Sequence, residues 1–401
     1  MTSQSVPHGI VGGMTLSSGS TGLSVAGLFA GIGGIEEGLG RAGHHGVLLC
    51  EVEPLAQSVL RSRYPAVELW DDVTTLPSLP RADIVAAGFP CQDLSQAGRT
   101  AGIGGRNSGL VDNVFRLLEG TDDQHPRWLV LENVPFMLQL DRGRAMKYLT
   151  SALERLGFMW AYRVVDTRAF GLPHRRQRVI VVASRVDDPR GVLFADEAGE
   201  PVERDDAGKA CGFYWTEGIR GLGWAVDAVP TLKGGSTIGI PSPPAILMPD
   251  GTLVTPDIRD AERLQGFNPK WTDVDRVDGK PVRVGHRWKL VGNAVSVPVF
   301  EWVGHRLAAP GTFDNTEHEI IQDGDRWPKA AWGVDGKVRR VSASAWPVRR
   351  RFRSLKPFLR YVPRPLSDRA VQGFHSRMAS SSLRFPQRLV EAMDVRVAEI
   401  A

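Results

Sequence analysis

A buried strand that ends at a Gly-Phe-Pro-Cys turn is the feature that most constrains this chain of 401 residues. The largely apolar run 82–87 stops at Gly88, and Phe89, Pro90 and Cys91 follow directly. A short apolar run bounded by turn residues predicts a central strand of an α/β sheet. Such sheets bind ligands beyond the carboxyl ends of their strands, so Cys91 is placed where a reactive side chain would act. Most free cysteines are instead small buried hydrophobes, and that alternative stays open for Cys91 taken alone.

The first two predicted strands lead into residue types that suit a cofactor site. Residues 23–29 predict a strand, and a glycine loop and a helix follow it. Residues 45–50 predict a second strand, which ends at Glu51. Glycines let the backbone approach a ligand closely, and an acidic residue about twenty positions later can bind ribose hydroxyls. A tight turn explains the glycines alone equally well, so their position matters more than their pattern.

Later strands carry a carboxylate and a basic turn. Residues 127–131 predict a strand that ends at Glu132, and residues 110–118 before it repeat apolar side chains at helical spacing. A glutamate at a strand end is more often solvated or capping, but beside Cys91 it becomes a candidate acid. Residues 158–166 and 178–183 predict a pair of strands joined by a turn rich in arginine.

Six short motifs occur in the order and spacing of a known family. They are Phe29-Ala30-Gly31-Ile32-Gly33-Gly34, Gly88-Phe89-Pro90-Cys91-Gln92, Glu132-Asn133-Val134, Arg176-Gln177-Arg178, Arg263-Leu264-Gln265-Gly266-Phe267 and Gly292-Asn293-Ala294-Val295. On these residues, which span about positions 23 to 305, the chain resembles the cytosine-C5 DNA methyltransferase family of bacterial or phage type. Six matches in order are not expected by chance.

The resemblance implies S-adenosylmethionine as the cofactor. Its expected site comprises Phe29 against the adenine, Gly31, Gly33 and Gly34 of the loop, Glu51, Asp72 at the adenine amino group, Pro90, and Asn293 closing the methionine pocket. The family usually has an acidic residue directly before the Leu-Phe of the loop, where this chain has Gly27. That departure affects only the contact near the methionine moiety. No metal site is expected, because the three cysteines share no metal-ligand spacing.

The resemblance also assigns catalytic roles. Cytosine C5 is a poor nucleophile. The Cys91 thiolate would therefore add to C6 and convert the ring to an enamine, whose C5 can attack the methyl group. Glu132 would donate to N3 as charge develops on the ring. Arg178 would bind the base, and Arg176 a nearby phosphate or carboxylate. The target base would flip out of the helix. Where the family commonly has Gln, this chain has His174, whose partner the sequence does not identify.

The expected architecture is a doubly wound, mostly parallel, Rossmann-like α/β domain with a smaller irregular domain. Residues 1–22 predict a flexible tail, and residues 23–185 with 286–309 predict the catalytic and cofactor-binding domain. Strand–helix alternation is lost within 186–285, and the resemblance makes this segment the target-recognition domain. Its expected contacts with DNA are Thr231, Lys233, Ser236 and Thr237. The alternative for each of these is a Pro-rich structural insert that reads no bases.

The C-terminal segment 310–401 lies outside the shared motifs and is strongly basic. Residues 326–388 contain sixteen Lys and Arg against two Asp, a net charge of +14, whereas the whole chain carries +4. Interleaved with aromatic residues, this composition is typical of a binder of nucleic-acid backbones and predicts Arg350 and Arg351 as phosphate contacts. In the alternative, the aromatic residues Trp327, Trp332, Trp346, Phe352 and Phe358 pack the segment against the catalytic domain.

Composition and the N-terminus bound the location and the partners. No segment approaches the length of a membrane span, and the start of the chain lacks the pattern of a secretory signal, so a cytoplasmic protein without a membrane partner is expected. The expected substrate is double-stranded DNA, and the protein is expected to bind it as a monomer. Its expected role is in restriction-modification or in the protection of host or phage DNA. A separate cognate restriction endonuclease is compatible with this. The alternatives are a tRNA cytosine-C5 methyltransferase and a non-catalytic DNA-binding regulator, which would need neither Cys91 nor Glu132.

Overall fold

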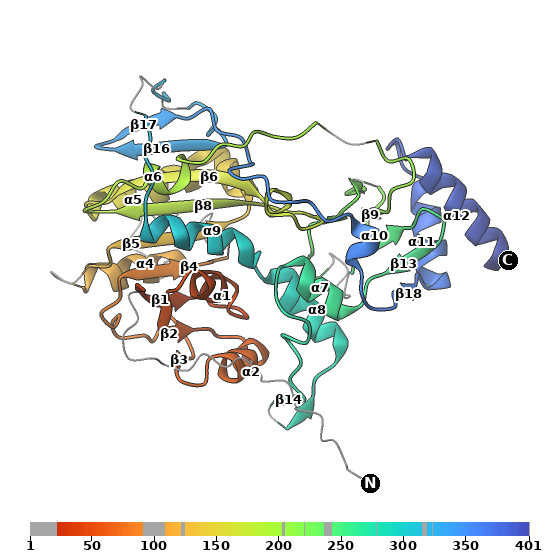
Figure 1. The fold of residues 1–401 in the computed structure, drawn as a ribbon, viewed down its shortest axis with the longest axis horizontal. Helices are drawn as coiled ribbons and strands as arrows, with labels where there is room; N and C mark the ends of the chain where they lie inside the picture. Colours follow the sequence, from red (N-terminus) through yellow and green to blue (C-terminus); the bar gives the residue numbers. More distant parts are fainter. Residues whose placement is uncertain are drawn as a thin grey trace, which may run out of the picture.

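Two domains lie side by side in the computed structural model of the chain (Figure 1). The structure describes residues 22–90, 109–121, 125–202, 205–219, 221–235, 243–277, 279–314, 319–322 and 324–400. In these ranges, the larger domain is built on a sheet of nine strands. In spatial order they are β17 (Lys337–Arg340), β16 (Ala330–Val334), β6 (Met159–Asp166), β8 (Gln177–Ser184), β5 (Trp128–Asn133), β4 (Ile84–Ala87), β1 (Ser24–Leu28), β2 (His45–Cys50) and β3 (Glu68–Trp70).

The large sheet confirms the predicted doubly wound, mostly parallel architecture. The five strands from β3 to β5 run parallel, and β8 is antiparallel to both β5 and β6. Strand order reverses between β1 and β4, so the glycine loop after β1 and the turn that begins at Gly88 leave the sheet at the same edge. Ligands bind at such a switch point because the two flanking loops diverge there.

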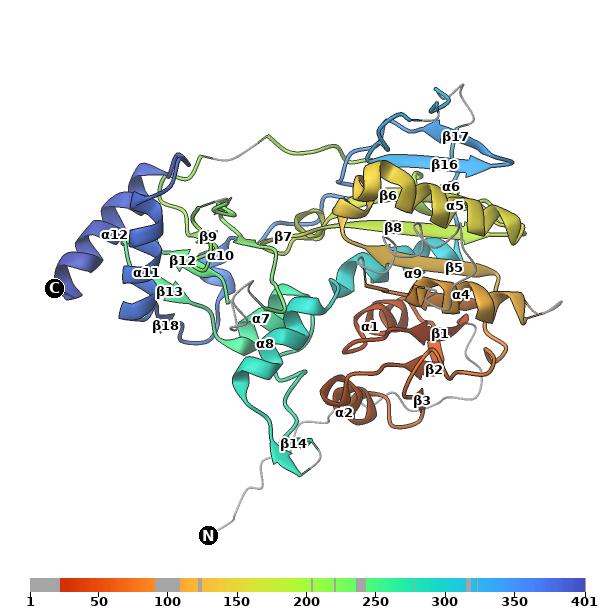
Figure 2. The ribbon, with the colours of Figure 1, turned by 180° about the vertical axis from the view of Figure 1, so that it is seen from behind.

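Helices cover both faces of the sheet. In Figure 1, α1 (Gly34–Arg41) and α9 (Val297–Ala308) lie in front of the strands. Figure 2 shows α4 (Leu110–Glu119) and α5 (Arg144–Arg155) in front of the opposite face. The predicted helix over 110–118 is confirmed, because α4 buries Val111, Val114, Phe115, Leu117 and Leu118. Helix α2 (Pro54–Arg63) follows β2, and α6 (Arg190–Leu193) contacts β6 and α9.

The smaller domain is built on short antiparallel strands, as the predicted loss of regular alternation indicated. Its sheet has the order β10 (Ala225–Val226), β9 (Cys211–Phe213), β12 (Ala245–Leu247), β13 (Leu253–Thr255) and β18 (Arg364–Pro365). The helices of this half are α7 (Ile258–Leu264), α8 (Val284–Asn293), α10 (Leu355–Phe358), α11 (Asp368–Ala379) and α12 (Gln387–Ile400).

The remaining elements are short. They are η1 (Pro135–Leu138), η2 (Leu140–Gly143), η3 (Thr167–Phe170), the pair β7 (His174–Arg175) with β11 (Val229–Pro230), and the pair β14 (Arg276–Val277) with β15 (Lys280–Pro281). None of the helices in the described ranges has both the length and the apolar character that crossing a membrane requires.

The C-terminal segment 310–401 is not a separate extension, which corrects the predicted domain boundaries. Strand β16 pairs with β6 and adds β17 to the edge of the catalytic sheet, whereas β18, α11 and α12 complete the smaller domain. The segment is divided because its aromatic residues join two different cores: Trp332 and Trp346 pack in the larger domain, and Phe358 packs with α7 and α8. Likewise, α6 lies within the predicted recognition segment but packs on the catalytic core.

We expect Phe374→Ala to destabilise the protein by about 3–5 kcal/mol, the usual cost of removing a buried aromatic ring. Phe374 on α11 is fully buried, and its ring centroid lies 5.2 Å from that of Phe213 on β9. Urea unfolding followed by tryptophan fluorescence measures the change. The matched control is Val395→Ala on α12, because Val395 is 60% exposed and its loss should change stability by less than about 0.5 kcal/mol. Equal stabilities of the two variants would show that α11 is not part of the smaller domain's core.

Candidate functional site

A cavity of about 710 Å³ opens at the carboxyl ends of β1, β2, β4 and β5. The predicted site residues that line it are Phe29, Gly31, Glu51, Asp72, Pro90, Glu132, Arg176, Arg178 and Asn293. Cys91 itself lies outside the described residues, but Pro90 directly before it lines the cavity. Residues that are far apart in the sequence, from position 29 to position 293, therefore line the same cavity.

The glycine loop supplies one wall of the cavity. Phe29 and Gly31 both have positive φ angles, 55° and 56°, and a Cβ atom at Gly31 would meet nothing within 4 Å. Gly31 therefore leaves open space beside the cavity. Gly33 and Gly34 do not line it: a Cβ at Gly33 would lie 2.7 Å from the Tyr64 ring, and one at Gly34 would lie 2.8 Å from Val295. These two glycines are required by packing.

Two carboxylates stand at the strand ends next to this loop. Glu51 follows β2, and its Oε2 accepts a hydrogen bond of 2.7 Å from the Gly31 N–H, while Oε1 accepts one of 2.8 Å from the Glu53 N–H. Asp72 follows β3, and its Oδ1 accepts a hydrogen bond of 2.8 Å from the Thr74 N–H. Backbone donors thus fix the orientation of both carboxylates at the cavity.

Glu132 and Arg178 form an ion pair in the same cavity. Their closest atoms, Arg178 Nε and Glu132 Oε1, are 2.7 Å apart, and the side chains are only 13% and 10% exposed. Burial lowers the pKa of Arg178, and the Glu132 carboxylate opposes that shift. The pair is possible because β5 and β8 are neighbours, with Glu132 opposite Ile180. An acidic group and a guanidinium are thereby held together in a largely desolvated site.

The turn that leads to Cys91 passes directly beside Glu132. A Cβ atom at Gly88 would lie 3.5 Å from Glu132 Oε2. One residue further on, Asn133 Nδ2 donates a hydrogen bond of 3.0 Å to the Phe89 carbonyl, which ties the turn to the end of β5. The chain that carries Cys91 is therefore anchored next to Glu132.

Backbone carbonyls hold Arg176 in the wall of the cavity, and its predicted contact with a nearby phosphate or carboxylate stays a prediction. Arg176 is 1% exposed, and its guanidinium donates to the carbonyl oxygens of Leu232 at 3.1 Å and Ala294 at 2.5 Å. Burial, with a further contribution from Arg178, lowers the pKa of Arg176 well below its usual value. Arg176 is thus a positioning residue that ties the segment after β11 and the end of α8 to the cavity wall.

His174, Gln265 and Ser296 belong to a buried hydrogen-bond network that was not predicted as a site from the sequence. His174 Nε2 accepts a hydrogen bond of 3.0 Å from the Leu232 N–H, so its Nδ1 carries the proton that is donated to the Leu264 carbonyl at 3.1 Å. Burial lowers the pKa of His174 well below its ordinary value, which keeps the ring neutral. Gln265 bridges Ala294 and Ser296. The only sequence signal for it was its place within the motif 263–267.

Of the four residues predicted to contact DNA in the smaller domain, the structure describes two, Thr231 and Lys233. Thr231 donates to the Arg175 carbonyl at 2.9 Å, and Lys233 pairs with Glu217. Ser236 and Thr237 lie outside the described residues. Asn293 packs against the segment that precedes them, since a Cβ at Gly234 would lie 2.1 Å from its Oδ1.

Arg350 and Arg351 lie elsewhere. Both are exposed, and neither lines the cavity. Arg350 pairs with Glu301 on α9 at 3.3 Å. A phosphate contact by either residue would be made away from the Glu132–Arg178 pair.

A buried carboxyl occupies the space that the missing side chain at Gly27 leaves. A Cβ atom at Gly27 would lie 2.1 Å from Oε1 of Glu36 on α1. Glu36 is 6% exposed, and neither of its carboxyl oxygens has a hydrogen-bond partner among the described residues. Burial raises the pKa of Glu36 to about 7, and the nearby Glu51 adds to the increase.

We expect the parent protein to lose stability between pH 5 and pH 8, and Glu36→Gln to remove most of this loss. Because the folded pKa is about 7 and the ordinary value is 4.5, Glu36 favours folding fully below pH 4.5 and loses this contribution as the pH rises to 7. Relative to the parent, the variant should gain about 2–3 kcal/mol in unfolding free energy between the two pH values. Urea unfolding at pH 5 and pH 8 measures this. Glu37→Gln, at the neighbouring position, is the control; a parallel pH dependence in parent and Glu36→Gln would contradict the prediction.

Comparisons with known proteins give one consistent relationship. Residues 23–204 match the family model of C-5 cytosine-specific DNA methylases. The chain is 49% identical over 366 residues to the Type II methyltransferase M2.BsuMI of Bacillus subtilis (strain 168), an alignment that covers 89% of this chain and 93% of that protein. It is 34% identical to the Type II methyltransferase M.BanI of Aneurinibacillus aneurinilyticus over 42% of this chain and 40% of that protein.

A solved structure shares the fold. The crystal structure of the Dnmt2 methyltransferase of S. pombe superposes with a TM-score of 0.52 at 17% identity, covering 71% of this chain and 99% of that chain.

Proposed function

Because this chain belongs to the family of C-5 cytosine-specific DNA methylases, we propose that it transfers a methyl group from S-adenosylmethionine to C5 of cytosine in a specific sequence of duplex DNA. One observation carries the proposal: the Glu132–Arg178 pair lies in the cavity whose rim Pro90 forms, directly before Cys91. A regulator that only bound DNA would have no use for a buried acid–guanidinium pair beside a cysteine.

The residues present fit S-adenosylmethionine. Gly31 leaves open space beside the cavity, and two carboxylates oriented by backbone N–H groups stand next to it. We assign Phe29 to the adenine, Glu51 to the ribose hydroxyls, Asp72 to the adenine amino group and Asn293 to the methionine end. When bound, the cofactor supplies a methyl group activated by a sulfonium. The protein's part is to hold the acceptor carbon in line with it and to exclude water.

The side chains supply the activation of the base. The Cys91 thiolate forms a bond to C6 of cytosine, and the electron pair of the C5–C6 double bond becomes available at C5 for attack on the methyl group. We assign Glu132 to N3 and Arg178 to O2, where they would stabilise the charge that develops on the ring. Loss of the C5 proton to a base and expulsion of the Cys91 thiolate then restore the double bond. Arg176 acts by positioning, through the carbonyls of Leu232 and Ala294.

Bisulfite sequencing of plasmid DNA from cells that express the protein tests this function. Protected cytosines should occur within one recurring sequence, and cells that express the Cys91→Ser variant should show none. Transfer of radiolabelled methyl groups to DNA but not to tRNA separates the proposal from a tRNA methyltransferase of the same fold. Unmodified DNA together with labelled tRNA would overturn the choice of substrate.

We infer that the target cytosine flips into the cavity, since neither face of C6 is accessible in a stacked duplex. A mismatch opposite the target removes part of the unpairing cost, so it should tighten binding by about tenfold for each 1.4 kcal/mol removed. Fluorescence anisotropy of matched and mismatched duplexes measures the difference. Equal affinities would count against flipping.

We also propose that the protein protects DNA in a restriction-modification system, because the relatives compared above are named Type II methyltransferases. The partner would be a separate endonuclease that recognises the same sequence, and one monomer would act on each site. Plasmid DNA modified by this protein should resist an endonuclease that cuts the sequence identified by bisulfite sequencing. Complete cleavage of fully modified plasmid would reject the protective role.

A further inference from the structure

A second cavity, of about 500 Å³, lies where the two domains and the C-terminal segment meet. Its walls come from α1, α9, the end of α7 with the loop after it, and the segment 350–360. It shares no lining residue with the first cavity. Five arginines and two glutamates line it: Arg41, Arg263, Arg350, Arg353, Arg360, Glu37 and Glu301.

Three of the five arginines are neutralised by carboxylates. The pairs are Arg41 with Glu37 at 2.9 Å, Arg350 with Glu301 at 3.3 Å, and Arg263 with Asp260 at 2.5 Å. The structure gives the guanidinium groups of Arg353 and Arg360 no ion pair or hydrogen bond within its described ranges, and both residues are exposed. The cavity therefore carries two positive charges without a counter-charge.

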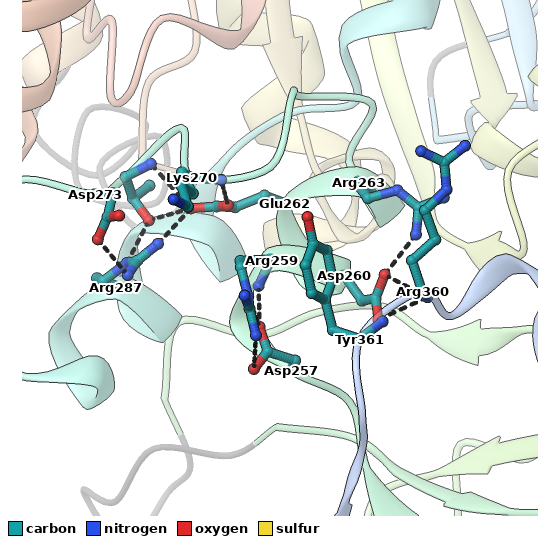
Figure 3. A network of polar contacts seen from close by, with 11 residues as sticks. Asp257, Arg259, Asp260, Glu262, Arg263, Lys270, Asp273, Arg287, Arg360 and Tyr361 are labelled. Atoms are coloured by element: carbon teal, nitrogen blue, oxygen red, sulfur yellow. Dashed lines mark hydrogen bonds and ion pairs between the residues drawn. The ribbon is translucent and has the colours of Figure 1, made fainter. Parts of the chain in front are cut away.

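Asp260 holds one side of this cavity in place. It is fully buried, and its carboxylate accepts hydrogen bonds from Arg263 Nη1 and from the backbone N–H groups of Arg360 and Tyr361, the latter two at 3.0–3.1 Å (Figure 3). Arg263 also donates to the Phe358 carbonyl at 2.6 Å. A single buried carboxylate thus fixes both the Arg263 guanidinium and the backbone from which Arg360 projects.

Glu262, two residues along α7, anchors the loop that follows this helix. It is also fully buried and accepts hydrogen bonds from the backbone N–H groups of Lys270 at 2.6 Å and Thr272 at 2.9 Å, and it pairs with Arg287 at 3.0 Å (Figure 3). These bonds anchor the loop 267–269, which lines the cavity. Two buried carboxylates, Asp260 and Glu262, therefore anchor two of the segments that line the cavity.

We propose that this second cavity binds phosphate, with Arg353 and Arg360 as its principal ligands and Arg263 beneath them. Two uncompensated guanidinium groups match one phosphate dianion or two phosphodiester groups, and guanidinium binds phosphate oxygens through paired N–H donors. The volume lies in the range of small-molecule sites. The phosphate comes either from the DNA backbone or from a phosphorylated small molecule. The site stands apart from the proposed transfer chemistry and does not depend on it.

The test compares the full-length protein with Arg353→Gln/Arg360→Gln. The matched control is Arg369→Gln/Arg384→Gln, which removes two exposed charges from the same C-terminal segment away from the cavity. In calorimetric titration with inorganic pyrophosphate, the parent and the control should bind saturably, and the cavity variant should bind at least about tenfold more weakly. Melting temperatures of all three proteins check that they are folded.

A second arm identifies the source of the phosphate. If it is DNA, the cavity variant should bind a non-target duplex more weakly, and the slope of log affinity against log salt should fall by about two units relative to the control. If it is a small molecule, pyrophosphate binding is lost while the DNA affinity and slope match those of the control. Pyrophosphate affinity and salt slope that are both unchanged in the cavity variant would overturn the proposal.

Discussion

Cys91→Ser should reduce methyl transfer by at least about a thousandfold while binding of DNA and cofactor persists. An alkoxide forms far less readily than a thiolate near neutral pH, so serine cannot start the addition at C6. The loss expected for a covalent nucleophile is of this order or larger. Initial rates of label transfer from S-adenosylmethionine to target DNA measure it, with binding followed separately by calorimetry.

The structure offers a control at a second cysteine. Cys50 ends β2 and also lines the first cavity, but burial raises the pKa of its thiol to about 12. Cys211 is buried in the smaller domain, and its thiol pKa is raised for the same reason. Cys50→Ser should therefore leave the transfer rate within a few-fold of the parent. If Cys50→Ser lost activity and Cys91→Ser retained it, Cys50 and not Cys91 would be the nucleophile.

Covalent trapping tests the same step without relying on a rate. DNA with 5-fluorocytosine at the target should hold the parent protein in an adduct, because fluorine cannot leave as a cation after methyl transfer. Cys91→Ser should form none. If the parent protein methylates ordinary DNA but gives no adduct on a denaturing gel, the covalent mechanism is wrong.

Glu132→Gln should lower kcat by about 10²- to 10⁴-fold, the range that general-acid catalysis contributes. The amide keeps the shape of the side chain but cannot transfer a proton, so the KM for DNA should change little. The same assay should show normal rates for Glu119→Gln at the exposed end of α4. A variant with full kcat would remove Glu132 from the mechanism.

A double-mutant cycle separates a catalytic role of the pair from a structural one. Because Arg178 and Glu132 are in direct contact, the effects of Glu132→Gln and Arg178→Gln on kcat should be strongly non-additive. The yield of 5-fluorocytosine adduct should fall with kcat in each variant. If melting temperatures fall but kcat per folded molecule does not, the pair only stabilises the fold.

The sequence by itself determined the elements and the residues at their ends. The second predicted strand matches β2 residue for residue, and the runs before Gly88 and Glu132 match β4 and β5 within two residues. Apolar runs bounded by turn residues report local burial, which is why these strands could be predicted without knowing their neighbours. The parallel arrangement then follows, because strand–helix alternation forces crossover connections.

Only the tertiary structure decided which side chains meet. Arg176 and its carbonyl acceptor on Ala294 are 118 residues apart, and no periodicity encodes such a partner. The resemblance assigned Arg176 to a nearby phosphate or carboxylate, whereas the backbone carbonyls of Leu232, Gly292 and Ala294 that its guanidinium contacts became known only from the structure. Glu36 could not be connected with Gly27 for the same reason, since the contact depends on how α1 packs against β1.

The C-terminal segment shows the limit of composition most clearly. A net charge of +14 over residues 326–388 is compatible with a phosphate-binding tail, with solvated surface or with ion pairs inside a fold. In the structure, β16 joins the large sheet, α11 and α12 complete the smaller domain, and only some of the arginines keep unpaired charge beside a cavity. Composition counts charges, whereas the function of a charge depends on its partners, and those are assigned when distant segments pack together.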